Sequence, residues 1–309
     1  MPVPKRKRGS DPSAHNAINS TVANKLREFG DLLHEQGSNG FRTRAYWRGA
    51  DMVARLDRPL DTLYKAEGLA GLVALPAIGT SIAAAIAELL RTGHWAQLER
   101  LRGGVTPATL FLSLPGIGTK LARRLSEETD IESLEELESA LHLGELSLKG
   151  FGPRRKRMLS AVLAERLGRS PLRMLAPAEA PPIDMLLKVD RMYRERAAKG
   201  QLRLITPRRF NPGGIAWLPI MHASHDDWHF TALFSNTALA HKLGKTKDWV
   251  MIFHQRDGFR EGQSTVVTET HGGSAGQRVV RGREDEIAAD PKASRRASEP
   301  PTGRQPITH

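Results

Sequence analysis

Along the first half of the chain, large apolar residues recur with the spacing of amphipathic helices. One series stands at i, i+4, i+7 and i+11, which places its members on one helix face: Val22, Leu26, Phe29 and Leu33. Gly37 is a suitable end for this helix. Similar spacing predicts further helices at residues 41–56, 60–67, 94–101, 133–143 and 154–167. Residues 16–168 are therefore predicted to form an all-α domain.

The periodicity changes in the second half, after a proline-rich stretch at 169–183 that is typical of a linker. A helix is predicted at 183–199, where apolar residues again keep helical spacing. Short segments rich in β-branched and aromatic residues then predict strands at 202–206, 216–222, 228–234, 248–253, 264–269 and 278–281. With one helix at 236–243 among them, residues 184–284 are predicted to form a small α+β domain with a mainly antiparallel sheet.

Both ends of the chain are polar and lack this patterning. Residues 1–15 carry a run of four cations, and residues 285–309 are rich in Asp, Arg, Ser and Pro. Such compositions bury too little apolar surface to order a segment, so both ends are predicted to be disordered. The expected fold class is multidomain, with an all-α domain, a linker, a small α+β domain with a mainly antiparallel sheet, and disordered termini.

Composition indicates a preferred binding partner and excludes the chemistry that needs cysteine. Of 309 residues, 46 are Lys or Arg and 34 are Asp or Glu, for a formal net charge of +12, which favours a polyanion such as DNA. The absence of cysteine excludes disulfides, thiolate metal sites and a cysteine nucleophile. No apolar run is long enough to cross a bilayer, and the first residues do not form a signal segment. We expect a cytoplasmic protein associated with the nucleoid.

The segment 112–125 is typical of a helix, a tight turn and a second helix. Its turn, Pro-Gly-Ile-Gly, holds Gly116 and Gly118, and the second helix opens at Thr119. Because the first amides of a helix have no internal partner, this geometry presents N–H groups to one phosphate. Lys120 adds a positive charge beside them. The segment therefore predicts a site that binds the DNA backbone.

Two looser copies of this turn flank it. The earlier copy places Gly79, Thr80 and Ser81 at the start of a helix, but Ala77 occupies a usual glycine position and is expected to strain the turn. The later copy contains two glycines and two cations: Gly150, Gly152, Arg154 and Arg155. Because one turn with one chemistry occurs three times, we predict three phosphate contacts.

Several of these segments, in this order, resemble the N-terminal helix-hairpin-helix region of bacterial family X DNA polymerases. The matching segments lie at 40–46, 67–79, 91–93, 114–118 and 150–152. The resemblance implies sequence-independent contacts to the DNA backbone, with a monovalent cation bound by hairpin carbonyls. It also implies that Arg42 and Tyr46 contact a 5′ phosphate. Arg44 belongs to the cationic side of the same predicted helix.

The chain departs from that family at both of its catalytic centres. Ser81 and Ala85 stand where the family can place its lyase lysine, so the Schiff-base nucleophile is missing. Polymerisation needs carboxylates that hold two Mg²⁺ ions on one face, whereas the adjacent Asp226 and Asp227 point to opposite faces of a strand. Glu269 is a weak third carboxylate. We therefore expect neither template-directed polymerisation nor the lyase reaction of that family, with Lys65 as the alternative to the missing nucleophile.

Three histidines in the second domain are candidate ligands for a divalent metal: His222, His225 and His229. Imidazole binds Zn²⁺ and similar ions, but hydrogen-bonded or exposed histidines fit the same pattern. The C-terminal half also resembles an uncharacterised bacterial domain in segments 234–238, 265–269 and 278–284, which assigns no reaction. Arg278, Arg281 and Arg283 fit either a phosphate-contacting surface or the solvent side of an edge strand.

These features predict a sequence-independent DNA-binding protein that acts in DNA repair or in the handling of DNA ends and gaps. The alternative is a DNA-processing enzyme, namely a metal-dependent nuclease, lyase or nucleotidyltransferase, with its chemistry in the C-terminal domain around these histidines and carboxylates. A third possibility is an adaptor whose C-terminal sheet binds a repair protein. The expected partners are duplex, nicked or gapped DNA and such a protein, and no membrane.

Overall fold

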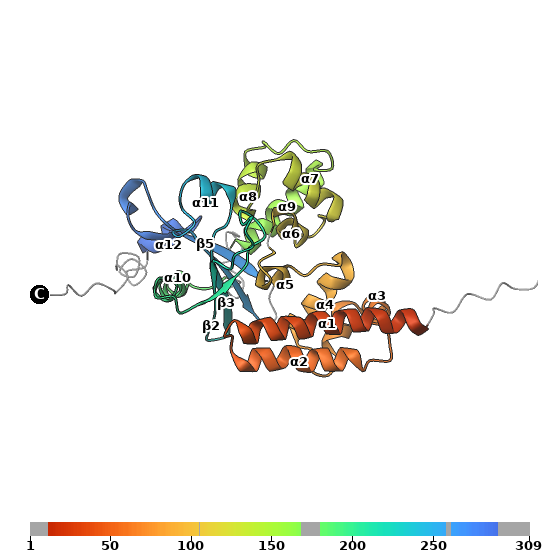
Figure 1. Cartoon of the computed structure of the whole chain (residues 1–309). Coiled ribbons are helices and arrows are strands. Elements are labelled where there is room, and N and C mark those ends of the chain that lie inside the picture. The colour runs from red at the N-terminus through yellow and green to blue at the C-terminus, as the bar shows by residue number, and fades with distance from the viewer. Residues whose placement is uncertain (1–11, 105, 168–179, 258–260, 290–309) are drawn as a thin grey trace, which may run out of the picture.

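The computed structural model describes residues 12–104, 106–167, 180–257 and 261–289 of the chain. Residues 1–11 and 290–309, which were predicted to be disordered, lie outside the described residues, as does most of the predicted linker. Helices make up the N-terminal half, and a sheet with further helices makes up the C-terminal half (Figure 1). The predicted fold class is confirmed in this respect.

The first five helices follow the predicted periodicity closely. They are α1 (Pro12–Glu35), α2 (Gly40–Ala54), α3 (Leu60–Val73), α4 (Thr80–Thr92) and α5 (Ala96–Leu101). The four apolar residues that predicted α1 are all buried: Val22, Leu26, Phe29 and Leu33. Helix α1 begins within the segment predicted to be disordered, and Pro12 fits its first turn because an N–H there would have no partner in the helix.

Four shorter helices follow and enclose a core of their own. They are α6 (Pro107–Leu112), α7 (Thr119–Glu128), α8 (Leu134–His142) and α9 (Pro153–Arg166). Ser133 caps α8 by accepting from the Glu136 amide, and the Glu136 carboxylate accepts from the Ser133 amide, as the spacing predicted. Each helix contributes a fully buried side chain to this core: Phe111, Leu125, Leu137 and Leu159.

The C-terminal half contains one six-stranded antiparallel sheet with its strands in chain order. The strands are β1 (Arg203–Ile205), β2 (Leu218–His225), β3 (Trp228–Phe234), β4 (Val250–Arg256), β5 (Gly262–Thr268) and β6 (Arg278–Val280). Strand β2 runs to His225, farther than predicted. The loop expected at 223–227 is instead a two-residue turn, in which Asp226 has a φ of 51°. The pairing of β2 with β3 therefore continues to the turn.

Three helices accompany the sheet: α10 (Ile183–Ala198), α11 (Ala238–Lys242) and α12 (Glu284–Ala289). Helix α12 lies in the segment predicted to be disordered. It is held by the buried Arg283, which donates to the carbonyl of Pro181 at 3.0 Å and pairs with Glu286 at 2.9 Å. No helix in the described residues is both long and apolar enough to span a membrane.

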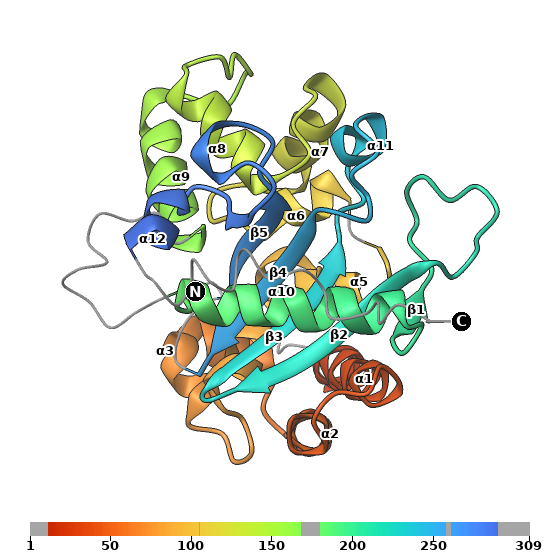
Figure 2. The ribbon, with the colours of Figure 1, turned by 90° about the vertical axis from the view of Figure 1, so that its left-hand side faces the viewer.

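Both faces of the sheet are covered. Figure 2 shows α10 crossing in front of the strands, and helix α5 lies on the opposite face, where the Arg100 guanidinium is 3.4 Å from the Phe253 ring. Every residue from Val250 to Gln255 is consequently buried, although alternate side chains of a strand point to opposite faces. One continuous core contains side chains from α1–α5, α10 and the sheet, so these elements pack together, apart from the core of α6–α9.

Candidate nucleic-acid interface

The structure contains the three predicted turns, and they share one backbone geometry. We name them hairpin 1 (residues 74–79), hairpin 2 (113–118) and hairpin 3 (147–152). In each, the amide of a buried apolar residue donates to the carbonyl three residues earlier: Ile78 to Leu75 at 3.2 Å, Ile117 to Leu114 at 3.2 Å and Phe151 to Leu148 at 3.0 Å. The next glycine then begins a helix by accepting the first backbone bond: Gly79 from Ala83, Gly118 from Ala122 and Gly152 from Lys156.

Hairpin 2 keeps both of its glycines and the first residues of its helix exposed. Gly116 has a φ of +77°, which favours glycine, and Gly118 is extended with a φ of −92°. Both glycines, Thr119 and Lys120 are exposed. The amides of Gly118, Thr119 and Lys120 donate to no group in the described part of the chain. Hairpin 2 therefore presents three adjacent N–H groups and a lysine to solvent.

Hairpins 2 and 3 lie side by side over the core of α6–α9. A Cβ atom on Gly116 would lie 2.4 Å from Cε of Met158 in α9, and one on Gly150 would lie 3.2 Å from Cδ1 of Leu121 in α7. Each turn thus packs against the helix that follows the other turn. Arg124 of α7 also donates to the carbonyl of Lys149 at 2.8 Å. These reciprocal contacts place both predicted phosphate sites on one module, which consists of α6–α9.

Hairpin 3 offers fewer donors than hairpin 2. Its helix begins with Pro153, which has no N–H. The Arg155 guanidinium donates to the Gly150 carbonyl, so it closes the turn and occupies one of the carbonyls at which the resemblance implies a cation. Gly152 and Arg154 are exposed. The exposed cations at hairpin 3 are therefore Lys149 in the turn and Arg154 at the start of α9.

Hairpin 1 differs from the other two. Ala77 has a φ of 61°, a left-handed conformation that alanine rarely adopts. The Ser81 hydroxyl donates to the Asp257 carboxylate at 2.9 Å, and Asp257 follows strand β4. A carboxylate of the sheet therefore stands at the start of α4, where an anion is favoured. Gly79 remains exposed. No sequence signal linked Ser81 to a residue so far along the chain.

The three predicted residues of α2 have different environments. Arg44 is exposed, whereas Arg42 is only partly exposed and its guanidinium lies 5.9 Å from the Phe29 ring. Tyr46 is 2% exposed, and its ring packs 4.5 Å from Phe29 and 5.9 Å from Trp95. Burial raises the pKa of its phenol. The predicted contact of Tyr46 with a phosphate is incompatible with this position, because the side chain is part of the core.

The sheet separates the three candidate metal ligands. His222 and His229 share the face toward α2, because Ser224 pairs with His229 and lies two residues from His222. His225 is on the other face, where its Nε2 lies 2.8 Å from Lys188 Nζ in α10. Within the described residues, no three His, Asp or Glu side chains are grouped closely enough to hold a metal ion.

His222 is bound at both ring nitrogens. Gln36 donates its amide N–H to the Leu101 carbonyl, which turns its oxygen toward His222 Nε2 at 2.9 Å. Since that oxygen only accepts, Nε2 carries the proton and Nδ1 accepts from the Thr231 hydroxyl at 3.1 Å. Burial, together with the nearby Arg42, lowers the pKa of His222 to about 3. The pKa of His229 is lowered by the same two causes.

The predicted carboxylates and arginines are also dispersed. Asp226 and Asp227 form the exposed turn between β2 and β3, and Glu269 follows β5, where its carboxylate accepts from the Thr270 and His271 amides. Arg278 is 6% exposed and pairs with Asp190 at 2.6 Å and with Asp248. Neither alternative foreseen for Arg278 is correct, because it holds α10 to the sheet.

These turns have the geometry of helix-hairpin-helix motifs, and the comparison with known families agrees. Residues 17–95 match the helix-hairpin-helix domain family. Such domains generally bind nucleic acid. The match covers about a quarter of the chain, from α1 to the residues after α4, and includes hairpin 1. Hairpins 2 and 3 lie beyond it and are recognised by their backbone geometry.

Proposed function

We propose that the protein binds the backbone of DNA without reading its sequence, chiefly through hairpins 2 and 3. The observation that carries this proposal is the set of exposed first-turn amides after Gly118, with Lys120 beside them. Backbone amides at a helix start bind phosphate oxygens irrespective of the base attached. Glycine allows close approach of the main chain because no Cβ atom intervenes.

The pairing of the two hairpins supports contact with more than one phosphate. Their reciprocal packing fixes one turn relative to the other, so the protein meets DNA with two preformed donors rather than two mobile loops. The net charge of +12 favours association with the polyanion over the whole surface. Arg44 of α2 and hairpin 1 extend the proposed contacts beyond the module.

Within this function we place the protein in DNA repair or in the handling of ends and gaps, associated with the nucleoid. Backbone contacts that ignore sequence suit a protein whose targets are defined by DNA structure. A 5′ phosphate near Arg42 is the finer form of this proposal. A monovalent cation at the hairpin carbonyls stays a prediction, which applies best to hairpins 1 and 2.

The test is fluorescence anisotropy with the full chain and labelled DNA of several unrelated sequences, as intact, nicked and gapped duplex. We expect equal affinity among sequences of one structure. Contact with about 5 phosphates predicts a slope of log K against log salt near −4 to −5. Equal affinity for DNA at low and moderate salt would contradict the proposal. A repair or gap-handling role further requires that gapped or nicked DNA bind more tightly than intact duplex.

A further inference from the structure

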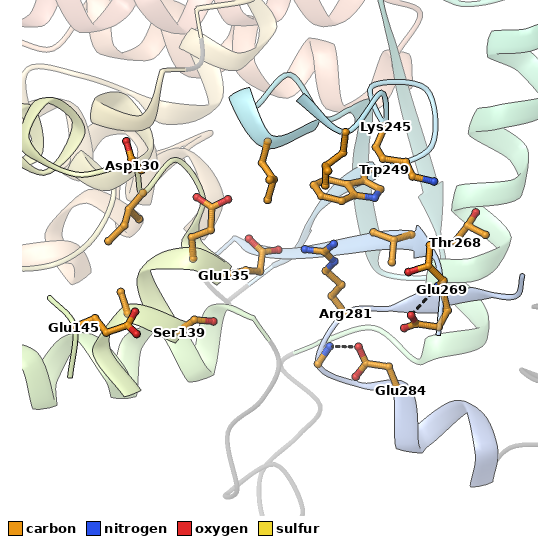
Figure 3. A pocket seen from close by; sticks show the side chains of 18 residues that line it. Asp130, Glu135, Ser139, Glu145, Lys245, Trp249, Thr268, Glu269, Arg281 and Glu284 are labelled. Carbon is orange, nitrogen blue, oxygen red and sulfur yellow. Dashed lines mark hydrogen bonds between the residues drawn. The ribbon is translucent and has the colours of Figure 1, made fainter. Parts of the chain in front are cut away.

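A cleft of about 660 Å³ lies between α8 and the end of the sheet (Figure 3). One wall comes from residues around α8, including Ile131, Ser139 and Ala140, and belongs to the module that carries hairpins 2 and 3. The other wall contains Trp249 and Val267, which are part of the larger core. The cleft therefore lies where two separately packed bodies meet.

The lining of the cleft is acidic in a basic protein. Six carboxylates and two cations line it: Asp130, Glu135, Glu136, Glu145, Glu269 and Glu284, with Lys245 and Arg281. Two positive and six negative charges make −4, against +12 for the whole chain. Such a surface repels phosphate groups. DNA and nucleotides are therefore poor ligands here, and a ligand with amino or guanidinium groups is favoured.

Four of these six carboxylates already bond within the fold, among them Glu135, which accepts from the Thr265 hydroxyl. Glu136 caps α8, Glu269 accepts from two amides, and Glu284 accepts from the Gly282 amide at 2.9 Å. Asp130 and Glu145 are different. Both are exposed, and neither makes a hydrogen bond or ion pair with another described residue. They are the acidic groups that remain available to a ligand.

The floor of the cleft is largely apolar. Leu239 in α11 and Leu243 directly after that helix are 37% and 53% exposed, so both offer apolar surface to a ligand. Beside them, the Arg281 guanidinium lies 4.2 Å from the Trp249 ring, and Glu135 lies across from it in the cleft (Figure 3). The cleft thus already accommodates one guanidinium of the chain between an aromatic ring and carboxylates.

We propose that this cleft binds a basic peptide segment of another protein, one in which Lys or Arg alternate with aliphatic side chains. The cations pair with Asp130 and Glu145, and the aliphatic groups cover Leu239 and Leu243. The segment of this chain after α12 is also basic, but Ile307 is its sole large aliphatic residue. Its cations could pair with Asp130 and Glu145, but it lacks the aliphatic side chains that would cover Leu239 and Leu243. The inference does not depend on DNA binding.

The experiment uses a fluorescein-labelled peptide with the repeat Lys-Leu-Arg-Ala and the full chain. We expect saturable binding, with no binding of a matched Glu-Leu-Gln-Ala peptide. The double variant Asp130→Lys with Glu145→Lys should lower the affinity at least about tenfold, since like charges then face the peptide. Leu243→Ser should lower it as well, because the apolar contact is lost. The matched control is Asp227→Lys with Glu35→Lys, which adds the same charge on exposed residues away from the cleft.

Two results would overturn the proposal. Equal loss in the cleft variant and the charge control would show general electrostatic attraction to the protein. Peptide binding that appears only when the chain is ended at residue 289 would show that the cleft serves its own C-terminal segment. DNA affinity is measured in parallel, and both charge variants should bind DNA alike. Failure of peptide binding is thereby distinguished from failure of DNA binding.

Discussion

Gly116 and Gly118 stand two residues apart in hairpin 2 but have different roles. Gly116 adopts a left-handed φ and lies against Met158, so a side chain there would distort the turn and its packing. Gly118 is extended, and a Cβ atom on it would meet nothing within 4 Å. A substitution of Gly118 therefore tests the approach of a ligand rather than the fold.

We predict that Gly118→Val lowers DNA affinity about tenfold with little effect on stability. The valine methyls cover the first amides of α7 and exclude a phosphate, which removes one charge-assisted hydrogen bond or more. Its effect on Tm should stay within about 2 °C, as for surface substitutions generally. Anisotropy and thermal melts measure the two effects. The control Gly273→Val lies at another open glycine, and a similar loss of affinity there would argue against the assignment.

His222 makes stability depend on pH. Its folded pKa is about 3, below the ordinary value near 6.5 of an unfolded histidine. The unfolded state therefore binds the proton first, and stability is full above pH of about 6.5 and falls as the pH drops toward about 3. Between pH 7 and pH 5 we expect a loss of about 2 kcal/mol in the free energy of unfolding.

Urea unfolding at several pH values measures this effect. The variant His222→Gln should show a shallower decline between pH 7 and pH 5, because its side chain does not titrate. The control His142→Gln removes an exposed histidine and should keep the slope of the parent protein. Parallel slopes for the parent and His222→Gln would contradict the role given to His222.

At the residue scale the sequence was informative about turns and less informative about the surroundings of single polar side chains. The φ of Gly116 and the strain at Ala77 follow from the repeated motif. Tyr46 was misplaced, because its position beside arginines does not reveal that Phe29 and Trp95 surround it. The pairing of Ser81 with Asp257 depends on the docking of a distant strand, which no local pattern encodes.

At the scale of elements, hairpins 2 and 3 repeat one turn but offer different numbers of free hydrogen-bond donors. Hairpin 2 has three unpartnered amides and Lys120, whereas hairpin 3 begins its helix with proline and uses Arg155 to close the turn. Hairpin 2 should therefore contribute more of the hydrogen bonding. Each hairpin is followed by an exposed cation in the first turn of its helix, Lys120 or Arg154, and hairpin 3 also contains the exposed Lys149.

We predict that Lys120→Gln and Arg154→Gln each reduce the steepness of the salt dependence by about 1 in the log–log slope. The double variant should lose both contributions while remaining insensitive to DNA sequence. The measurement is anisotropy over a range of salt concentrations. Lys199→Gln is the matched control, since Lys199 is exposed at the end of α10 and away from the hairpins. A slope unchanged in the double variant would exclude these cations from the interface.

The contact between α5 and the sheet rests on a buried ion pair. Arg100 is 4% exposed, donates to both Glu261 oxygens at 2.8 Å and stacks on Phe253. We predict that Arg100→Met lowers the free energy of unfolding by about 3 to 5 kcal/mol, because the Glu261 charge is left buried without its partner. Adding Glu261→Met should recover part of this loss.

Urea denaturation of the single and double variants provides the measurement. The comparison pair is Arg123 with Glu127 on α7, whose side chains are 67% and 62% exposed. Arg123→Met should change the free energy of unfolding by less than about 1 kcal/mol. If Arg100→Met were as mild as Arg123→Met, the ion pair would not join α5 to the sheet as described.

The sequence predicted the elements better than their ends and faces. Residues 228–234 were predicted as a strand and form β3 with the same bounds, because their β-branched and aromatic residues lie between clear turns. The end of β2 was missed, since Asp226 and Asp227 make a turn too short to separate from the strand by composition. The separation of His225 from His229 follows directly from that register.

At the scale of the whole molecule, packing does not follow the order of the chain. Helices α1–α5 share a core with the sheet, although α6–α9 and the predicted linker come between them in sequence. Hydrophobic periodicity predicts which face of a helix is buried and does not identify the partner that covers it. The face that α5 turns to the sheet was therefore not predictable from its own residues.

We predict that residues 106–167 fold alone, whereas residues 12–104 do not. The first fragment is small, but it retains the complete core of α6–α9. The second loses the sheet and α10, which share its core, and leaves Arg100 without Glu261. Circular dichroism should show a cooperative thermal transition for the first fragment and a broad one for the second. Cooperative melting of residues 12–104 by themselves would contradict the shared core.

The hydrogen bond from Ser81 to Asp257 couples anion binding at hairpin 1 to the attachment of the end of β4. An anion bound at the start of α4 would be repelled by the Asp257 carboxylate that the sheet supplies there, so occupancy of that turn and attachment of the strand end oppose each other. Thermodynamic reciprocity then requires that whatever loosens the end of β4 strengthens anion capture at hairpin 1, and that anion capture there loosens the strand.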